Sequence, residues 1–186
     1  MGLEMIKEIV VVGDLILTTK ANVAWRGDKK IALVLDDLRS TVRSVGGAGL
    51  AAPQIGVGVA ACVWVDNEGK IHELVNPVLV RAGQEKVIDY EACLSIPGQW
   101  GQVERFREIW VRARERNWKE VRWHLHGFSA RVVQHEIDHL EGVLFTQKVI
   151  GPLVDAEEFA RIRHEQDLAR QEAERQLDSA DEPLMA

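Results

Sequence analysis

Residues 129–142 read SARVVQHEIDHLEG, and this stretch decides the fold. Apolar side chains recur along it at the spacing of an amphipathic helix, at Val132, Val133, Ile137 and Leu140. Ser129 can cap the first turn and Gly142 can end the last, so we expect a helix that runs to about Glu141. We therefore expect the apolar face of this helix to pack against a core.

The same segment contains the pattern His-Glu-x-x-His, at residues 135–139. Positions i and i+4 of a helix lie one turn apart on the same face, so His135 and His139 can reach one metal ion. Glu136 projects from an adjacent position, near enough to handle the proton of a metal-bound water molecule. A pair of surface histidines is the alternative, but the apolar residues around the motif favour the metal site.

Two histidines do not complete a catalytic metal site, which usually has three protein ligands and one open position. One candidate for the third ligand is Cys93, in the segment YEACLSIPG, where an irregular, proline-ended stretch can hold a thiolate. A buried free cysteine with no ligand role is the alternative for this residue. Other candidates are Glu157 and Glu158, either of which would make the chain a zinc protease. The residue types alone leave these choices open.

A glycine-rich segment, GAGLAAPQ, occupies residues 47–54. It has no lysine and no Gly-x-Gly-x-x-Gly order, which argues against a phosphate-binding loop. Glycines allow the backbone of a substrate to approach closely, and Gln54 offers an amide donor within an otherwise apolar stretch. The alternative is a buried glutamine that only satisfies a neighbouring loop.

The remaining apolar patterns predict an α+β fold. Residues 31–45 follow helical spacing, with Asp28 able to cap the start and Gly46 able to end the helix. Residues 109–114 and 121–126 alternate apolar and polar side chains, which predicts an antiparallel pair with one wet face. His124 and His126 fall on that face. Because the strands come in adjacent runs rather than alternating with helices, the class is α+β; further strands are expected at Ile9–Val12, Val59–Val65 and Glu73–Val80.

The composition is that of a globular domain. The chain has 186 residues, 46% of them hydrophobic, with 23 basic and 29 acidic residues and a net charge of −6. The acidic balance argues against a nucleic-acid-binding function. Two cysteines and an N-terminus without a secretory pattern predict reduced thiols in a cytoplasmic protein. The uncharged stretch 45–65 contains five glycines and Pro53, so we expect no membrane span.

The acidic charge is concentrated near the C-terminus. Residues 155–182 carry ten acidic and four basic side chains, so the rest of the chain is neutral. We therefore expect a catalytic body over residues 1–150 and an acidic C-terminal helix and tail of the same domain over residues 151–186. The helix has apolar residues at helical spacing, Phe159, Ile162, Ala169, Ala173 and Leu177, which predict an apolar edge that packs on the body. A helix that binds a partner is the alternative.

Taken together, the three segments resemble the peptide deformylase family. Its motifs are a Gly-x-Gly-Leu-Ala-Ala-x-Gln loop, a Glu-Gly-Cys-Leu-Ser segment, and Gln-His-Glu-x-Asp-His-Leu on a helix. Here they stand as residues 47–54, 91–95 and 134–140, in the family's order, and the likeness extends over about residues 9–145. The resemblance implies a deformylase-like fold, with antiparallel strands packed around the central metal-binding helix.

The resemblance also implies a metal-dependent hydrolase that removes the N-formyl group from the N-terminal methionine of newly made polypeptides and releases formate. The implied metal ligands are Cys93, His135 and His139, with water in the fourth position. The implied ion is Fe²⁺, although Zn²⁺ or another divalent metal suits the same donors. A water molecule activated by the ion would attack the formyl carbon.

Further roles come from the same resemblance. Glu136 would take the proton of the water and later deliver it to the departing nitrogen. The Gln54 side-chain amide and the Leu94 backbone N–H would meet the developing oxyanion together with the metal. The residues implied to bind or enclose the extended peptide are Ala48, Gly49, Ala92, Glu91, Arg105, Phe128 and Val132, with Glu91 and Arg105 forming an ion pair that shapes the cleft.

Two departures from the family pattern bear on function. Ala92 replaces the usual glycine, from which we expect an altered fit rather than lost activity, unless the backbone there needs positive φ. Bacterial relatives can dock on the ribosome through a basic C-terminal helix, whereas this acidic segment would be repelled by RNA. Ribosome contact is therefore not expected through a basic tail. A deformylase-like protein that binds without turnover is a third hypothesis, and the presence of Glu136 and Gln54 argues against it.

Overall fold

The computed structural model describes residues 5–180, and the side chains through residue 172. Its helices are α1 (Lys30–Val45), α2 (Gly127–Leu140) and α3 (Ala156–Ala180), with the 3-10 turns η1 (Leu15–Thr18), η2 (Ala52–Ile55) and η3 (Phe145–Gln147). Its strands are β1 (Gly49–Ala51), β2 (Ala61–Val65), β3 (Ile71–Ala82), β4 (Lys86–Cys93), β5 (Ile96–Phe106), β6 (Glu108–Arg114), β7 (Glu120–His126) and β8 (Val154–Asp155).

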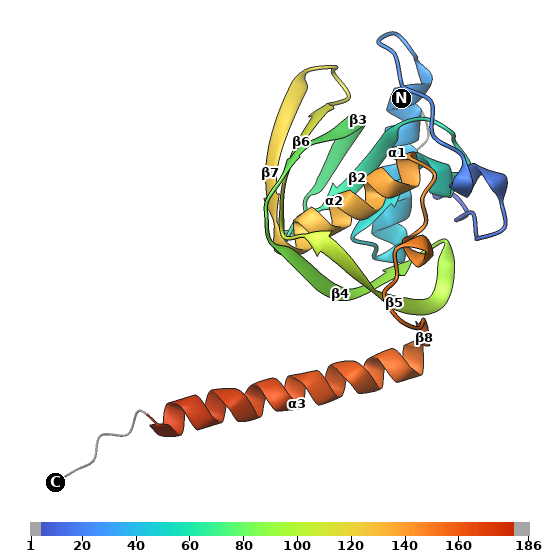
Figure 1. Ribbon diagram of the computed structural model, residues 1–186. Helices are drawn as coiled ribbons and strands as arrows, with labels where there is room; N and C mark the ends of the chain where they lie inside the picture. The colour runs from blue at the N-terminus through green and yellow to red at the C-terminus, as the bar shows by residue number, and fades with distance from the viewer. Residues whose placement is uncertain (1–4, 181–186) are drawn as a thin grey trace.

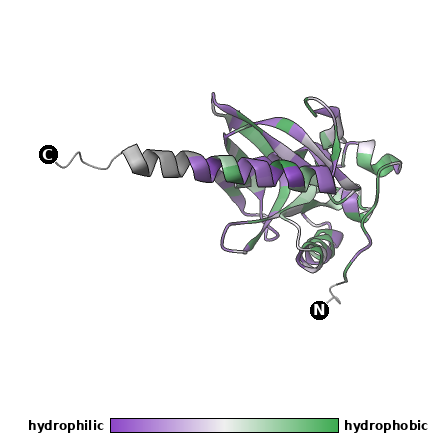
Figure 2. Cartoon of the chain, turned by 90° about the horizontal axis from the view of Figure 1, so that it is seen from below, coloured by the Kyte–Doolittle hydropathy of each residue, from purple (hydrophilic) through white to green (hydrophobic). Residues whose placement is uncertain are grey.

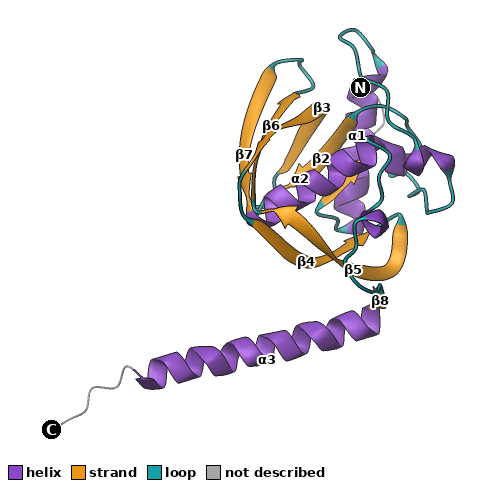
Figure 3. Cartoon of the chain, in the orientation of Figure 1, coloured by secondary structure: helices purple, strands orange, loops and turns teal. Residues whose placement is uncertain are grey.

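The strands form two antiparallel sheets with α2 between them (Figures 1 and 3). One sheet has five strands in the order β1-β2-β3-β6-β7, and the other has three in the order β4-β5-β8. Helix α2 contacts strands of both sheets, including β2, β7 and β5. A helix enclosed in this way needs apolar side chains on more than one face, which the segment 130–140 supplies. The α+β class and the central helix predicted from the sequence are confirmed.

Strand β2 separates two parts of the core. Ala61 and Val63 pack with α1 on one face of the five-stranded sheet, while Cys62 and Trp64 pack with α2 on the other. Successive side chains of a strand point to opposite faces, and here both faces are covered, so the strand is apolar throughout. Helix α1 begins and ends close to the predicted residues: Asp28 accepts a hydrogen bond from the Lys30 backbone, and Gly46 ends the helix with φ of 66°.

Two predictions about local structure are wrong. Ile9–Val12 is not a strand, because its backbone bonds instead to irregular segments: Val10 donates to the Gln54 carbonyl and Val12 to the Ser95 carbonyl, each at 2.8 Å. Helix α2 begins at Gly127, two residues before the expected cap, and its N-cap His126 makes no side-chain capping bond.

The segment around Cys93, predicted to be irregular, is irregular only locally, because it belongs to a hairpin whose register shifts between Ala92 and Cys93. Strands β4 and β5 form a hairpin there, joined at Leu94 and Ser95. The strand predicted over Glu73–Val80 is confirmed within the longer β3, and that over Val59–Val65 is confirmed in its last five residues, which form β2. The antiparallel pair with one wet face is confirmed as β6 and β7.

Helix α3 leaves the body after β8 and extends away from it (Figure 1), and it is polar over most of its described length (Figure 2). Its contact with the body is at its first turns, where Phe159 and Ile162 are half-buried. All side chains of residues 163–172 are exposed, so the predicted apolar edge is wrong at Ala169; the side chains of Ala173 and Leu177 and the tail 181–186 lie outside the described residues. Within the described residues, no helix is long and apolar enough to cross a membrane.

Candidate functional site

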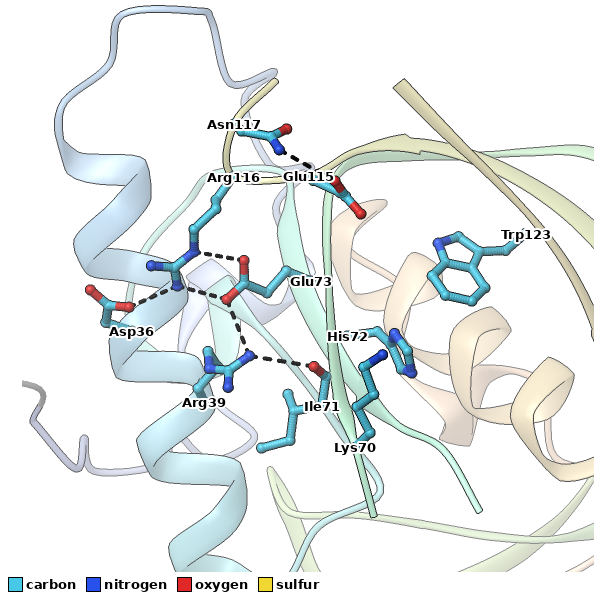
Figure 4. Close-up of a pocket in the computed structure, with 10 residues that line it drawn as sticks. All are labelled: Asp36, Arg39, Lys70, Ile71, His72, Glu73, Glu115, Arg116, Asn117 and Trp123. Atoms are coloured by element: carbon cyan, nitrogen blue, oxygen red, sulfur yellow. Dashed lines mark hydrogen bonds and ion pairs between the residues drawn. The ribbon is translucent and has the colours of Figure 1, made fainter. Parts of the chain in front are cut away.

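Two hollows in the described part of the molecule are large enough to receive a ligand. One, of about 580 Å³, lies between α1, the start of β3 and the β6–β7 turn (Figure 4). Its charged side chains neutralise one another: Arg116 bonds to Glu73 and Asp36, and Arg39 also bonds to Glu73. The other, of about 520 Å³, lies beside α2 and is lined by Cys93, His135 and Glu136. Reactive side chains gather only in the second of these two hollows.

Cys93 is held at the end of β4, where the β4–β5 hairpin turns. The ladder runs in regular register from Lys86 to Ala92 and then shifts, so that Cys93 pairs with Ile96. This irregularity directs the thiol toward α2, and its Sγ lies 3.2 Å from Nε2 of His139. Bulges of this kind commonly aim a side chain into a site.

Helix α2 places the two histidines as its periodicity requires. The ligand atoms of Cys93, His135 and His139 all lie within 4.8 Å of one another, which is the spacing of donors that share one ion. His139 is almost fully buried and His135 nearly so. Among the described residues, Glu157 and Glu158 belong to no such group, so the zinc-protease alternative is wrong about the third ligand.

A buried carboxylate orients His135. Glu91 Oε2 lies 3.0 Å from His135 Nδ1, which leaves Nε2 to interact with Cys93. Arg105 donates two bonds to Glu91, both at 2.9 Å, and also pairs with Asp138 of α2. Burial opposes ionisation of Glu91, but the hydrogen bonds from His135 and Arg105 outweigh it and lower the pKa of this carboxyl to about 2. Glu91 is therefore an anion at neutral pH.

Glu136 is buried beside the three donors, with 3% of its surface exposed. Burial is the main cause that raises its pKa to about 7, while the charge of His135 acts in the opposite sense. Its Oε2 has no hydrogen-bond partner among the described residues. A carboxyl group that exchanges its proton near neutral pH is suited to general acid–base catalysis.

The two histidines differ in electrostatic environment. Burial lowers the pKa of His139, and the neighbouring His135 and Arg105 lower it further, so this ring is neutral and its lone pair is available. For His135 burial acts in the same direction, but hydrogen bonds with Cys93 and Glu91 outweigh it and raise the pKa to about 10. An ion that binds His135 therefore has to displace a proton.

Gln54 lies on η2, beside the Cys93 thiol. Its side-chain oxygen accepts a hydrogen bond from the Ala51 backbone at 2.9 Å, which fixes which end of the amide points inward. The amide nitrogen then faces Cys93 Sγ at 3.5 Å and Ser95 Oγ at 3.3 Å. The residue is 2% exposed, and its amide is a donor directed at the cavity.

The other residues singled out from the sequence divide into two groups. One group lines the cavity and consists of Ala48, Gly49, Ala92, Leu94, Phe128, Val132 and Glu91. Arg105 does not line it and supports Glu91 from behind, 5% exposed. Ala92 has no positive φ, since Asn76 and Trp118 are the non-glycine residues with positive φ in the described chain. An alanine therefore fits at this position without backbone strain.

Sequence reasoning missed Arg131, which completes the network around Glu91. It is 8% exposed, donates to Glu91 Oε1 at 2.8 Å and also bonds to the Val103 and Val87 carbonyls. The available signal was its position, because Arg131, His135 and Asp138 share one face of a helix that is otherwise apolar there. An arginine at a core position requires buried partners.

The donor set fits a resident metal ion on three observations. It combines one thiol with two imidazoles, the tautomer of one imidazole is set by Glu91, and an unpartnered carboxylate oxygen lies beside them. A His-Glu-x-x-His helix with a cysteine thiol beside its two histidines is typical of the metal-dependent hydrolases.

Comparisons with known proteins identify the family within that class. Residues 6–153 match the family model described as polypeptide deformylase. The chain is 44% identical to a peptide deformylase of Caldicellulosiruptor bescii over 137 residues, which cover 74% of this chain and 81% of the relative. The chain belongs to the polypeptide deformylase family.

Solved structures agree with this assignment. The structure of a peptide deformylase from Thermotoga maritima superposes with a TM-score of 0.75 at 31% identity, covering 79% of this chain and 99% of that one. The Met-Ala-Ser-bound class I type b peptide deformylase of Acinetobacter baumannii superposes with a TM-score of 0.74 at 26% identity, covering 79% and 100%. Helix α3 lies beyond the residues that the family model matches.

Proposed function

We propose that this protein removes the N-formyl group from the N-terminal methionine of newly made polypeptides and releases formate. The observation that carries the proposal is the convergence of Cys93, His135 and His139 within 4.8 Å, beside the buried carboxyl of Glu136 and inside a cavity. The Met-Ala-Ser bound to the Acinetobacter baumannii relative has the chemistry of a deformylated peptide, which supports the choice of substrate.

In this proposal Cys93, His135 and His139 hold one divalent ion. When bound, the ion supplies Lewis-acid chemistry, which lowers the pKa of water and withdraws electrons from a carbonyl. Glu136 accepts a proton from the attacking water molecule. It then delivers this proton to the peptide nitrogen as the bond between that nitrogen and the formyl carbon breaks. Its raised pKa suits both directions of transfer, because a group that titrates near the working pH can both take and give a proton.

Gln54 and Leu94 act on the oxygen of the formyl group. The Gln54 amide nitrogen is already directed into the cavity by the Ala51 backbone, so little reorganisation is needed as charge develops. Leu94 contributes its backbone N–H from the β4–β5 turn, and one such donor is typically worth about 3–4 kcal/mol of transition-state stabilisation.

The peptide lies extended beside β1 and the end of β4. Backbone groups of Ala48, Gly49 and Ala92 bind its main chain, in the manner of an added strand. Phe128 and Val132 enclose the methionine side chain, and both line the cavity from the first turns of α2. The hairpin and the helix form the two walls of the cleft. Arg105, paired with Glu91 on the hairpin and with Asp138 on the helix, holds these walls together.

The ion that we propose is Fe²⁺, with Zn²⁺ or another divalent metal able to use the same donors. Elemental analysis of protein purified without oxygen tests this choice. We expect close to one iron per chain in the wild type and little in Cys93→Ala. A wild type that contains no iron but one zinc would overturn the choice of ion and leave the reaction intact.

The reaction is tested with formyl-Met-Ala-Ser and Fe²⁺-loaded protein under anaerobic conditions, with formate as the measured product. We expect Glu136→Ala to bind the metal and to lose about 10²–10⁴-fold in rate, the usual contribution of a general acid–base group. If wild-type protein releases no more formate than this variant, the proposed enzymatic function is wrong. Metal content has to be measured in both samples, so that loss of the ion is not mistaken for loss of the base.

We propose a cytoplasmic location, supported by two free cysteines, both buried. We also propose that any contact with the ribosome uses a surface other than α3. The described part of this helix is acidic and exposed, and RNA would repel it.

A further inference from the structure

A second cluster of metal-binding side chains lies on the wet face of strands β6 and β7, away from the cavity. His124 and His126 are two residues apart on β7, so their side chains leave the same face of the sheet. Glu108 is the direct cross-strand partner of His126 in the antiparallel register. Strand geometry alone therefore brings two imidazoles and one carboxylate together.

The distances within this cluster are those of donors around one ion. Glu108 Oε1 lies 2.6 Å from His124 Nε2 and 3.6 Å from His126 Nδ1, and all three atoms lie within 4.8 Å of one another. The cluster is reachable from solvent, because the side chains of His124 and His126 are 44% and 59% exposed. Among the described residues it is the only grouping of this kind besides the one in the cavity.

Neighbouring groups hold the cluster in place before any ligand arrives. The ring of His124 stacks on Trp110, with ring centres 4.3 Å apart and planes 11° apart, and the Arg81 guanidinium covers Trp110 from 4.4 Å. The Glu108 backbone accepts a hydrogen bond from Gly83 at 2.8 Å. Donors fixed on paired strands lose little conformational freedom when they bind an ion.

We propose that Glu108, His124 and His126 form a second metal site that binds a divalent transition ion of the Zn²⁺ type. Imidazole and carboxylate donors suit Zn²⁺, Cu²⁺, Ni²⁺ and Co²⁺ rather than Mg²⁺ or Ca²⁺, which prefer oxygen donors alone. Three protein donors at the surface leave coordination positions to solvent, so the site can also take a ligand from a partner. The site shares no residue with the cavity, and it stands whether or not the proposed reaction is correct.

Cobalt(II) distinguishes the two sites, because the cavity has a thiolate donor and the surface cluster has none. Thiolate–cobalt(II) complexes show a charge-transfer absorption in the near ultraviolet that imidazole and carboxylate complexes lack. Titration of the metal-free protein, combined with equilibrium dialysis and elemental analysis, should show two bound ions per wild-type chain. Only one of them should contribute to the thiolate absorption.

The variants then separate the sites. His126→Ala and Glu108→Gln should each bind one cobalt ion and keep the full thiolate absorption, whereas Cys93→Ala should keep the surface ion and lose the absorption. His164→Ala is the matched control, because this histidine is exposed on α3, lies in neither cluster, and should leave both ions bound. Zn²⁺ should displace the surface cobalt, and Mg²⁺ should not.

Trp110 provides an independent readout, since it stacks directly on His124. Cu²⁺ bound at the cluster should quench part of the tryptophan fluorescence, and Trp110→Phe should remove that part while the second ion still binds. The proposal is wrong if wild-type protein binds a single ion, or if His126→Ala and Glu108→Gln both still bind two. Either result would mean that Glu108 and His124 form an ion pair only.

Discussion

Gly49 is the residue whose side chain, a single hydrogen, matters most for the chemistry. A Cβ at this position would lie 2.4 Å from Glu136 Oε1 and 2.9 Å from its Cδ and Cγ. Such contacts are far inside van der Waals distance, so Glu136 would have to move. The Glu136 carboxyl can therefore take its position only because residue 49, on β1, has no Cβ.

We predict that Gly49→Ala lowers kcat by about 10²-fold, the cost of moving a reacting group by about 1 Å. Metal content should stay at the wild-type value, because the three atoms nearest the new methyl group all belong to Glu136 and not to a proposed ligand. Gly58→Ala is the matched control, since nothing lies within 4 Å of its Cβ and its φ is not positive. Equal kcat values for Gly49→Ala and wild type would show that Glu136 needs no fixed position.

The roles of residues that belong to a sequence motif could be predicted from the sequence. The roles of residues that depend only on their contacts in the fold could not. Cys93, His135, His139, Glu136 and Gln54 belong to short patterns whose chemistry is legible in the chain. Arg131 has no such pattern. Its partners are Glu91 and two carbonyls of the β4–β5 hairpin, some 28 to 44 residues away, and its role depends on that packing.

At the scale of elements, Arg105 joins the β4–β5 hairpin to α2, because it pairs with Glu91 on the hairpin and with Asp138 on the helix. Glu91 lies on β4, Arg105 on β5, and Asp138 on α2 receives the remaining guanidinium bond. The pKa of Glu91 is lowered in the folded chain to about 2 from 4.5. The carboxylate therefore stabilises the fold fully above about pH 4.5, and this contribution is lost as the pH falls toward 2.

We predict that Glu91→Gln lowers the free energy of unfolding by about 3 kcal/mol at pH 7 in metal-free protein. The difference from wild type should shrink between pH 4.5 and pH 2, as the wild-type carboxyl becomes protonated. Denaturant unfolding at several pH values measures both effects. Glu104→Gln is the control on the same hairpin, where an exposed pair with Lys86 contributes about 0–1 kcal/mol. A difference that does not change with pH would contradict the assignment.

The first turn of α3 supports the mouth of the cavity. Phe159 stacks on Trp100, with ring centres 3.8 Å apart and planes 5° apart, and also contacts Tyr90. Trp100 and Tyr90 both line the cavity. Loss of this stack would free the Trp100 ring without touching the donors around the metal site.

We predict that Phe159→Ala raises KM for formyl-Met-Ala-Ser by about 2–10-fold and leaves kcat unchanged, since an aromatic pair is worth about 0.5–1.5 kcal/mol. Phe159→Tyr keeps an aromatic ring and should behave as wild type. Steady-state kinetics of the three proteins decide the matter. A fall in kcat with unchanged KM would place the effect on the chemistry instead of on binding.

Elements with a strong period were predictable, and those without one were not. Helix α1 and the β6–β7 pair each show apolar residues at a single repeat and have one face in the core, and α2 shows the helical repeat although it is buried on more than one face. Strands β4 and β5 lack that signal, because most side chains of β4 before Glu91 are exposed on both faces. Ile9–Val12 has the composition of a strand but no strand beside it, so tertiary context decided its conformation.

At the scale of the whole molecule, the net negative charge lies apart from the candidate active site. The ten acidic and four basic residues of 155–182 account for all the net charge, and α3 carries most of them away from the body (Figure 1). An appended charged helix of this kind affects which large partners approach the molecule. The charges beside the cavity are paired with one another, as in the Glu91–Arg105 pair.

We predict that wild-type protein binds ribosomes weakly, and that exchanging Glu157, Glu165, Asp167 and Glu172 for lysine tightens binding. The same four positions changed to glutamine should give an intermediate affinity. Binding of the lysine variant should fall steeply with salt, as counterion release requires, and kcat on a short peptide should not change. Cosedimentation at physiological salt measures this; nanomolar, tail-dependent binding by the wild type would contradict it.

The donors in the cavity come from two elements that are remote in the chain, the β4–β5 hairpin and α2. The site is complete only while the hairpin stays docked on the helix, so ion affinity and docking are thermodynamically linked. Any substitution that favours undocking must lower the affinity for the ion, even when it touches none of the three donors. The reciprocal effect is observable as slower hydrogen exchange of the hairpin amides when the ion is present.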